Sequence, residues 1–274
     1  MTSTDLTPEH RADPRSTPAK FLGDTRAVFT REILLVLRDP FTLIFSLLQP
    51  LVFLGLFAPL LAGSLGGFGP IGGSTADTLQ WFVPGVIVMI SLFGTSMTGS
   101  NLLYEMMTGS YERVLATPLD RSAILVGRSL KEFAPLVVQG LIIVGLCVPF
   151  GFTFYPLHVL AGLALLGLFG VGVGALSMAL ALAAKGREWL FWGVQQALIF
   201  PLLILSGMML PLESGPGWMQ TAARFNPLTY IVDAERALLG GSFTDPVVGW
   251  GLLAGAITCA LGLVVGIRKT AKTI

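Results

Sequence analysis

The chain has 274 residues, of which 53% are hydrophobic and 12% are charged, and its formal net charge is +1 at pH 7. Soluble domains carry roughly 25% charged residues, so this composition excludes an ordinary soluble domain and predicts apolar helices in a bilayer. The near-neutral charge also excludes a strongly basic surface for nucleic acid, and we expect no nucleic-acid partner.

Residues 1–19 are expected to form a disordered cytoplasmic tail. Pro8, Pro14 and Pro18 stand there among threonine, aspartate and arginine residues. Such a polar, proline-rich composition cannot bury a core. The tail also lacks an adjacent cleavable apolar stretch, so it is not expected to be a signal peptide.

Residues 20–39 combine apolar and charged positions at helical spacing, which predicts an interfacial connecting helix along the inner membrane leaflet. Its apolar positions are Leu22, Phe29, Ile33 and Val36. Its charged stripe consists of Asp24, Arg31 and Arg38. Pro40 is expected to end the helix, because proline disfavours helical geometry in the residue before it. Two roles stay open: a membrane anchor alone, or a lever that also contacts a cytoplasmic subunit.

Six apolar segments are long enough to cross a bilayer, since about 20 mostly apolar residues span the hydrocarbon core. They cover residues 41–62, 81–103, 123–150, 158–183, 189–210 and 247–267. We therefore expect an all-α integral membrane domain with six transmembrane helices over residues 40–274. The third segment carries Arg128, Lys131 and Glu132 in its first turns, and we expect these groups to stay near the interface or in water. Its membrane part should begin near Phe133.

Lysine and arginine residues gather in alternate connections, which sets the expected orientation by the positive-inside rule. They lie before the first span, between spans two and three, between spans four and five, and after the last span. The other connections carry only Arg224 and Arg236. Six spans then place both the N-terminus and the C-terminus in the cytoplasm.

Three pairs of glycines are four residues apart within the apolar segments. They are Gly170 and Gly174, Gly251 and Gly255, and Gly262 and Gly266. This spacing favours close contact between membrane helices. In a chain with 33 glycines, the spacing alone is a weak indication.

The connection 104–122 is the longest one expected between spans on the cytoplasmic side. Val114 and Leu115 directly follow a Glu-Arg pair, and Pro118 is expected to end a short helix near Thr117. The apolar side chains have no core of their own in this connection, so they predict a docking surface on the membrane or on another protein. A solvated connection between two spans is the alternative.

Residues 211–245 are too long for a passive turn and too apolar for a disordered linker, so we expect short external helices on the outer leaflet. Thr229 is a candidate N-cap for a helix that runs to Leu239, before two glycines end it. Asp233 and Arg236 would form a local ion pair on that helix, because they are three residues apart.

The sequence contains no arrangement typical of a catalytic or metal site. It has no Gly-x-x-x-x-Gly-Lys-Ser/Thr phosphate loop, so the chain is not expected to bind ATP by itself. His10 and His158 each stand alone, which excludes a paired histidine metal site and a histidine-based triad. Cys147 and Cys259 lie in apolar stretches and predict neither a disulfide nor a metal site. We expect no cofactor in this chain.

Uncharged polar residues at membrane depth are the candidates for a substrate path. They are Ser46, Gln49, Ser96, Ser100, Asn101, Gln139, Gln195 and Gln196. Together they suit an amphiphile that needs hydrogen bonds but no fixed counter-charge. Each also has a structural alternative, since serine can bond to its own helix and glutamine can bridge two helices. The apparent lack of ionisable groups in the middle of the spans disfavours a secondary transporter.

Three motifs together resemble a known family. The connection carries Glu105, Gly109, Tyr111-Glu112-Arg113-Val114-Leu115, Thr117-Pro118 and Gly127-Arg128. The segment before the last span carries Phe225-Asn226-Pro227-Leu228-Thr229-Tyr230, Asp233, Arg236-Ala237-Leu238-Leu239 and Gly240-Gly241, and the first span follows Arg38-Asp39-Pro40. This order resembles the ABC exporter permeases, or ABC-2 type membrane proteins, of the daunorubicin and multidrug-resistance class. Met106-Met107-Thr108 departs from the charged residues that this family often has there.

The resemblance implies the membrane half of an ATP-driven exporter in a bacterial cytoplasmic membrane. Two permease copies, expected to form a homodimer among membrane lipids, would pair with two separate ABC ATPase subunits that bind ATP and magnesium. The segment 105–115 would be the coupling helix, with Glu112 and Arg113 holding the contact. The full set implied for ATPase coupling is Glu105, Gly109, Glu112, Arg113, Leu115, Thr117, Pro118, Arg31 and Arg38.

The substrate class expected from the resemblance and the uncharged polar residues is an amphiphilic drug, a secondary metabolite or a lipid. A permease of similar architecture could instead carry a lipid-linked glycan or a polysaccharide. A membrane scaffold that transports nothing is the third alternative, because six spans and a docking loop do not by themselves prove movement of a substrate.

Overall fold

The computed structural model describes residues 18–38, 40–64, 74–117, 119–212 and 215–272, and every regular element in these ranges is helical. The expected disorder of residues 1–17 lies outside the described part. Residues 18 and 19, expected in the tail, already belong to the first helix.

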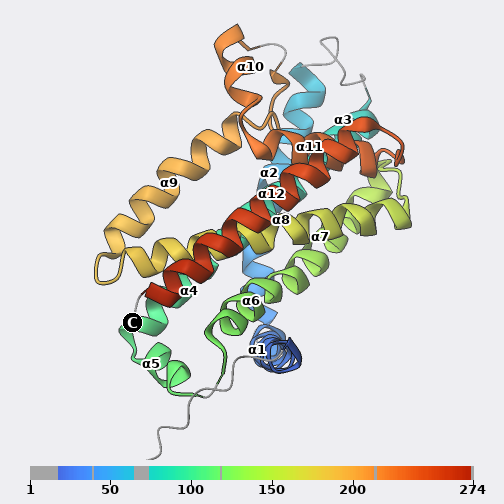
Figure 1. Cartoon of the computed structure of the whole chain (residues 1–274). Coiled ribbons are helices and arrows are strands. Elements are labelled where there is room, and N and C mark those ends of the chain that lie inside the picture. The colour runs from blue at the N-terminus through green and yellow to red at the C-terminus, as the bar shows by residue number, and fades with distance from the viewer. Residues whose placement is uncertain (1–17, 39, 65–73, 118, 213–214, 273–274) are drawn as a thin grey trace, which may run out of the picture.

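Twelve α-helices and one 3₁₀ turn, η1, make up the described chain (Figure 1). They are α1 (Pro18–Arg38), α2 (Pro40–Ser64), α3 (Thr75–Ser96), α4 (Thr98–Met107), α5 (Ser110–Leu115), α6 (Arg121–Lys131), α7 (Phe133–Cys147), η1 (Val148–Phe150), α8 (Pro156–Ala183), α9 (Glu188–Ile204), α10 (Gly217–Ala223), α11 (Pro227–Leu239) and α12 (Pro246–Lys272). Helices α1 and α5 lie at one end of the molecule, whereas α10 and α11 lie toward the other (Figure 1).

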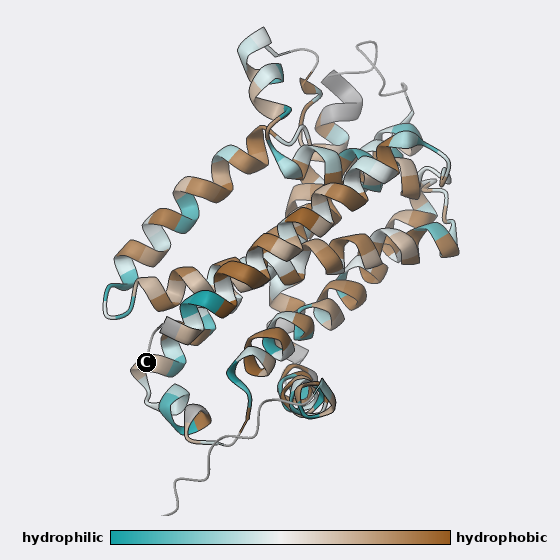
Figure 2. Ribbon diagram, in the orientation of Figure 1, coloured by the Kyte–Doolittle hydropathy of each residue, from teal (hydrophilic) through white to brown (hydrophobic). Residues whose placement is uncertain are grey.

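Four helical segments are long and apolar enough to cross a membrane. They are Thr75–Met107, Arg121–Phe150, Pro156–Ala183 and Pro246–Ala271. The apolar stretch Ile44–Leu60, part of the 25-residue helix α2, and helix α9, Glu188–Ile204, are shorter. Hydrophobic residues dominate these helices, while the short helix α5 and the turn between α8 and α9 are more hydrophilic (Figure 2). The all-helical fold is thus confirmed for the described residues, and four of the six expected spans coincide with helices that are long and apolar enough for a full crossing.

Helices α8 and α12 pack backbone to backbone through glycine. A side chain at Gly172 would meet the Thr258 carbonyl oxygen, and one at Gly262 would overlap the Gly172 backbone. Gly251 of α12 lies beside Leu165 of α8, whereas Gly262 lies beside Gly172. Residue numbers therefore rise together along both helices, so the two helices run parallel. The four-residue glycine spacing on α12 therefore serves close helix contact.

Helix α11 packs against α3, α8 and α12. Ile231, Val232 and Ala234 are fully buried. Asn226, and not Thr229, caps the helix: its side-chain oxygen accepts from the Leu228 N–H at 3.0 Å. Asparagine is a good cap, and the Pro227 that follows suits the first helical position.

The Asp233–Arg236 pair on α11 is confirmed, with 3.5 Å between the carboxylate and the guanidinium. Arg236 also donates to the Gly207 carbonyl at 2.8 Å and lies 3.9 Å from the centre of the Trp81 ring. The arginine therefore joins α11 to α3 and to the turn after α9, in addition to its local partner.

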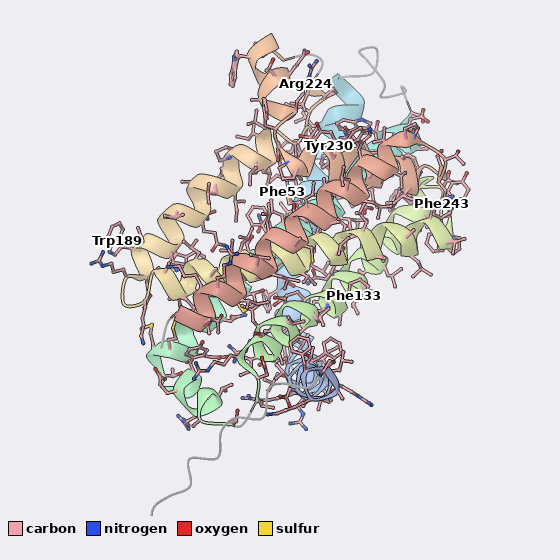
Figure 3. The ribbon with its side chains drawn as sticks, in the orientation of Figure 1. Phe53, Phe133, Trp189, Arg224, Tyr230 and Phe243 are labelled. Atoms are coloured by element: carbon pink, nitrogen blue, oxygen red, sulfur yellow. The ribbon has the colours of Figure 1, made fainter. Side chains whose placement is uncertain are left out.

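Helix α9 stands apart from the other long helices (Figure 1). It ends at Ile204, so the expected continuation of this helix to Leu210 is wrong. The chain turns at Gly207, whose φ of 71° is a conformation that only glycine adopts without strain. Trp189, at the far end of α9, projects away from the bundle and is 74% exposed (Figure 3).

Two interruptions shape the interior. The segment expected as the second span divides at Met97 into α3 and α4, and the third divides at Glu132 into α6 and α7. At the first break the Ser177 hydroxyl of α8 donates to the Ser96 carbonyl, and the Gly99 N–H donates to the Ser177 oxygen at 3.1 Å. These bonds satisfy backbone groups that a regular helix would pair internally.

Candidate transport cavity and its ion-pair cluster

A buried ion-pair cluster joins α1, α4 and α6. Arg128 Nη2 donates to Glu105 Oε2 at 2.6 Å, and Arg128 Nε lies 3.6 Å from Glu32 Oε1. The second distance is too long for a hydrogen bond, so this contact is an electrostatic one. The side chains of Arg128 and Glu32 are each 6% exposed. The stability that an ion pair so well shielded from water contributes depends strongly on the charge of both partners.

Close packing of α1 on α6 brings Glu32 to Arg128. Gly127 leaves room for α1, because a side-chain carbon at this position would lie 2.9 Å from Val28. Near the start of α6, Asp24 accepts a hydrogen bond from the Asp120 N–H at 3.0 Å. Figure 1 shows α1 end-on while α8 and α12 extend across the view, so α1 crosses the direction of the long helices.

Lys131 and Glu132 extend the cluster toward the α6–α7 break. Lys131 Nζ donates to Glu32 Oε2 at 3.1 Å and lies 4.0 Å from Glu132 Oε1. Thr98 of α4 donates to the same Glu132 oxygen at 3.0 Å. The side chains of Lys131 and Glu132 are each 14% exposed. These charged groups find partners inside the protein instead of lying in water. We call Glu32, Glu105, Arg128, Lys131 and Glu132 the Arg128 cluster.

A cavity of about 590 Å³ adjoins the cluster between α1, α2, α3, α4 and α7. Lys131 and Glu132 line it at the side of the cluster. Leu35, Met89 and Leu136 contribute part of its apolar wall. The volume falls within the range of about 300 to 1,000 Å³ that is typical of small-molecule sites, and a mostly apolar wall with a few polar groups is typical as well.

Five residues of the expected substrate path line this cavity. They are Ser46, Gln49, Ser100, Asn101 and Gln139. Gln139 of α7 also donates to the Ser46 hydroxyl of α2 at 2.6 Å. That bond bridges two helices, so the structural alternative for glutamine holds for Gln139 in addition to its position at the cavity.

Three residues of the expected path lie elsewhere. Ser96 is buried and its hydroxyl donates to the Leu92 carbonyl of its own helix. Gln195 is buried on α9, and Gln196, its neighbour, is exposed. None of the three lines the cavity. Ser91 and Thr95 line it instead, and the sequence analysis missed both.

The cavity differs from the expected path in a second way. The sequence pattern predicts a lining without fixed charge, whereas Lys131 and Glu132 are part of the wall. Their position near the start of an apolar segment suggested exposure, and only the fold shows that α1 and α4 cover them. The same fold places Glu32 in the Arg128 cluster; its sequence signal, an acidic residue beside Arg31 on an amphipathic helix, is weak.

The expected coupling segment is two helices, α4 and α5, separated at Gly109. Gly109 has a φ of 67°, a left-handed conformation that favours glycine. Glu105 ends up in the Arg128 cluster, while Glu112 and Arg113 are exposed on α5. Thr117 closes the segment by donating to the Val114 carbonyl at 2.5 Å. Arg31 and Arg38 on α1 are exposed.

The apolar side of α5 packs on the protein itself, contrary to the expected unpartnered surface. Val114 is buried with Val28 and Ile124, and Tyr111 is buried among residues of α4, α6 and α8. Burial raises the pKa of the Tyr111 hydroxyl, although the nearby Arg128 and Arg121 act in the opposite direction. Pro118 and the side chain of Leu115 lie outside the described part of the structure. The exposed surface of α5 is therefore the charged one.

Several permeases are similar to this chain over most of its length. The daunorubicin resistance ABC transporter permease of Streptomyces coeruleorubidus is 30% identical over 205 residues, which cover 74% of this chain and 70% of that protein. A permease named for doxorubicin resistance from Mycobacterium tuberculosis is 24% identical over 271 residues, covering 97% and 95%. A transport permease of Pyropia yezoensis is 30% identical over 242 residues, covering 84% and 80%.

The matching region contains most of the elements described above. Residues 24–239, from within α1 to the end of α11, match the family described as ABC-2 type transporter. They include the whole Arg128 cluster and every residue that lines the cavity. With this match over more than half of its length, the chain belongs to the ABC-2 type transporter family, and its relatives are permease subunits of ABC transporters.

Proposed function

We propose that this chain is the permease subunit of an ATP-driven exporter that moves amphiphilic drugs, secondary metabolites or lipids out of a bacterial cell. Membership of the family, together with a cavity of about 590 Å³ among membrane helices, is the observation that carries the proposal. The chain has no phosphate loop, so a separate ABC ATPase subunit would supply ATP hydrolysis with magnesium. A second copy of the permease would complete the transporter.

Both termini and α5 would face the cytoplasm in this proposal. The arginine and lysine residues of α1, of the α4–α6 region and of the turn after α8 favour this orientation by the positive-inside rule. Glu112 and Arg113, exposed on α5, and Arg31 and Arg38, exposed on α1, would then be available to the ATPase. Helices α2 and α9 would supply the remaining crossings.

The Arg128 cluster offers a physical route from the ATPase to the cavity. Glu105 and Glu32 link Arg128 to α4 and α1, and Lys131 and Glu132 bring the same cluster to the cavity wall. A movement of α1, or a movement of α5 that is passed on through α4, would therefore shift charged groups at the cavity. For ATP to do work, nucleotide binding must favour one of two permease arrangements over the other.

The first test is gentle purification of the tagged chain from its native membrane, followed by identification of partners and assay of ATP hydrolysis. We expect a soluble phosphate-loop subunit in stoichiometric amount and hydrolysis that vanadate inhibits. A crosslinked complex without such a subunit would contradict the export proposal and would favour the membrane scaffold.

Charge reversal at the α5 surface tests the coupling role. Glu112→Lys together with Arg113→Glu should abolish ATP-driven export while membrane insertion stays normal, because both side chains are exposed and support no buried contact of the fold. Glu188→Lys, an exposed charge reversal at the start of α9, is the matched control and should leave export intact. Undiminished export in the double variant would contradict the coupling role.

A further inference from the structure

Helix α11 carries a buried glutamate that has no polar partner among the described residues. Glu235 is 1% exposed, and neither of its carboxyl oxygens has a hydrogen bond. The carboxyl group lies against the backbone of α8, because a side-chain carbon at Gly162 would overlap Oε2. An ionised carboxylate in this place would lose its hydration without a compensating bond. The close packing of α11 on α8 therefore favours the neutral, protonated form.

The helices around Glu235 supply no compensating charge. Helix α11 packs against α3, α8 and α12. The other titratable residues of these four helices are Asp77 on α3, His158 on α8, Cys259, Arg268, Lys269 and Lys272 on α12, and Tyr230, Asp233 and Arg236 on α11 itself. None of the described side chains gives Glu235 a hydrogen bond, and burial alone raises the pKa of its carboxyl group, to about 8.

The position of α11 also determines that of the end of α9. Asn226 Nδ2 donates to the Leu202 carbonyl at 2.7 Å, and the Thr229 hydroxyl donates to the Leu205 carbonyl at 3.0 Å. Because α9 stands apart from the other long helices (Figure 1), these bonds tie its C-terminal end to α11. A displacement of α11 would therefore be passed on to α9.

We propose that Glu235 is a proton-binding site that controls the packing of α11 on α8, and with it the position of the end of α9. The bound proton keeps α11 in place. When the proton passes to water, the remaining negative charge regains hydration only if α11 separates from α8. The site stands without the proposed export function; only the side from which the proton arrives depends on the proposed orientation, in which α11 lies toward the outside of the cell.

Infrared spectroscopy of the full chain in a non-ionic detergent detects the proton directly, because a neutral carboxyl group and a carboxylate absorb at different frequencies. The difference spectrum between the wild type and Glu235→Gln isolates this group. We expect a neutral carboxyl band at pH 6 that disappears with a midpoint at about pH 8. Glu188→Gln, at an exposed position on α9, is the matched control and should remove only a carboxylate band.

Amide hydrogen exchange of residues 227–239 tests the control of packing. The wild type and Glu235→Gln are compared at the same pH, since pH also changes the intrinsic exchange rates. A carboxyl pKa of 4.5 in the separated state and of about 8 in the packed state would raise the separated population by up to about fiftyfold from pH 6 to pH 8. The exchange rate of the wild type relative to Glu235→Gln should therefore rise at least about tenfold between these pH values.

Glu235→Met, whose side chain is of similar length and never charged, is a second variant. It should match Glu235→Gln at both pH values, and it carries the comparison if the glutamine variant fails to fold. Absence of the neutral carboxyl band at pH 6, or an exchange ratio that does not change with pH, would overturn the inference. Neither measurement involves ATP or export, so a failure here and a failure of the proposed export function are distinguishable.

Discussion

Glu132 and Glu235 lie in the interior of the protein under opposite conditions. Glu132 belongs to the Arg128 cluster, where Thr98 donates to it and Lys131 lies within 4.0 Å. Glu235, on α11, is 1% exposed, and neither of its carboxyl oxygens has a hydrogen-bond partner among the described residues. Its carboxyl group lies against Gly162 of α8, where a side chain would have no room.

The comparison shows how neighbouring groups determine the charge of a buried carboxyl group. In the Arg128 cluster, charged neighbours and the Thr98 hydroxyl compensate the carboxyl groups at the wall of a cavity. Around Glu235, desolvation by burial raises the carboxyl pKa to about 8 and no charged side chain opposes it. A neutral glutamate at neutral pH packs α11 to α8 but offers no fixed charge.

The largest expected effect comes from breaking the charged cluster. Arg128→Ala leaves Glu32 and Glu105 without their shared base, and loss of one partner from a buried pair costs about 3 to 5 kcal/mol. The free energy of unfolding in a mild detergent measures the loss. Arg121→Ala, an exposed arginine on the same helix, is the control and should change it little. Equal losses of unfolding free energy in both variants would contradict the claim that the Arg128 cluster stabilises the fold.

The second prediction concerns Glu235 and pH. Between the ordinary carboxyl pKa of 4.5 and about 8, the folded chain holds this proton and the unfolded chain releases it. Stability should therefore fall as pH rises through this window, and level off above it. Glu235→Gln should remove this part of the pH dependence and unfold at a higher temperature than the wild type at pH 8.

Thermal unfolding at pH 5 and pH 8 measures the Glu235 effect. Glu188→Gln, at an exposed position on α9, is the matched control and should follow the wild type. A wild-type pH dependence that persists unchanged in Glu235→Gln would show that the isolated glutamate is not its source.

The smallest effect should come from a neutral pair beside the same cavity. Gln139→Ala removes the 2.6 Å bond to Ser46 that joins α7 to α2. A neutral hydrogen bond contributes about 0.5 to 1.5 kcal/mol, so the loss in unfolding free energy should be well below that of Arg128→Ala. A loss as large as that of the arginine variant would remove the distinction between charged and neutral contacts.

The sequence predicts the helices well because each depends on local patterns. Apolar runs mark α8 and α12 within a few residues of their ends, and Pro40 marks the end of α1. The cap of α11 is Asn226 and not the expected Thr229. The candidate site is predicted only in part. Polar residues at membrane depth indicated five residues of the cavity wall.

The Arg128 cluster could not be predicted from the sequence, because it joins residues far apart in the chain. Lys131 and Glu32 are 99 residues apart, and Arg128 and Glu105 are 23 apart. Charges at the start of an apolar segment are normally solvated, and only the packing of α1 and α4 over α6 changes that expectation. The burial of Val114 against α1 depends on the same packing.

The most direct test of the account measures export and ATP hydrolysis together in proteoliposomes that contain the complete complex. Glu105→Gln retains the shape of the side chain but weakens the link between α4 and Arg128. The account predicts that hydrolysis continues while the amount of a fluorescent amphiphile exported per ATP falls, whereas Glu188→Gln keeps the wild-type ratio. An unchanged ratio in Glu105→Gln would contradict the claim that the Arg128 cluster couples the ATPase to the cavity.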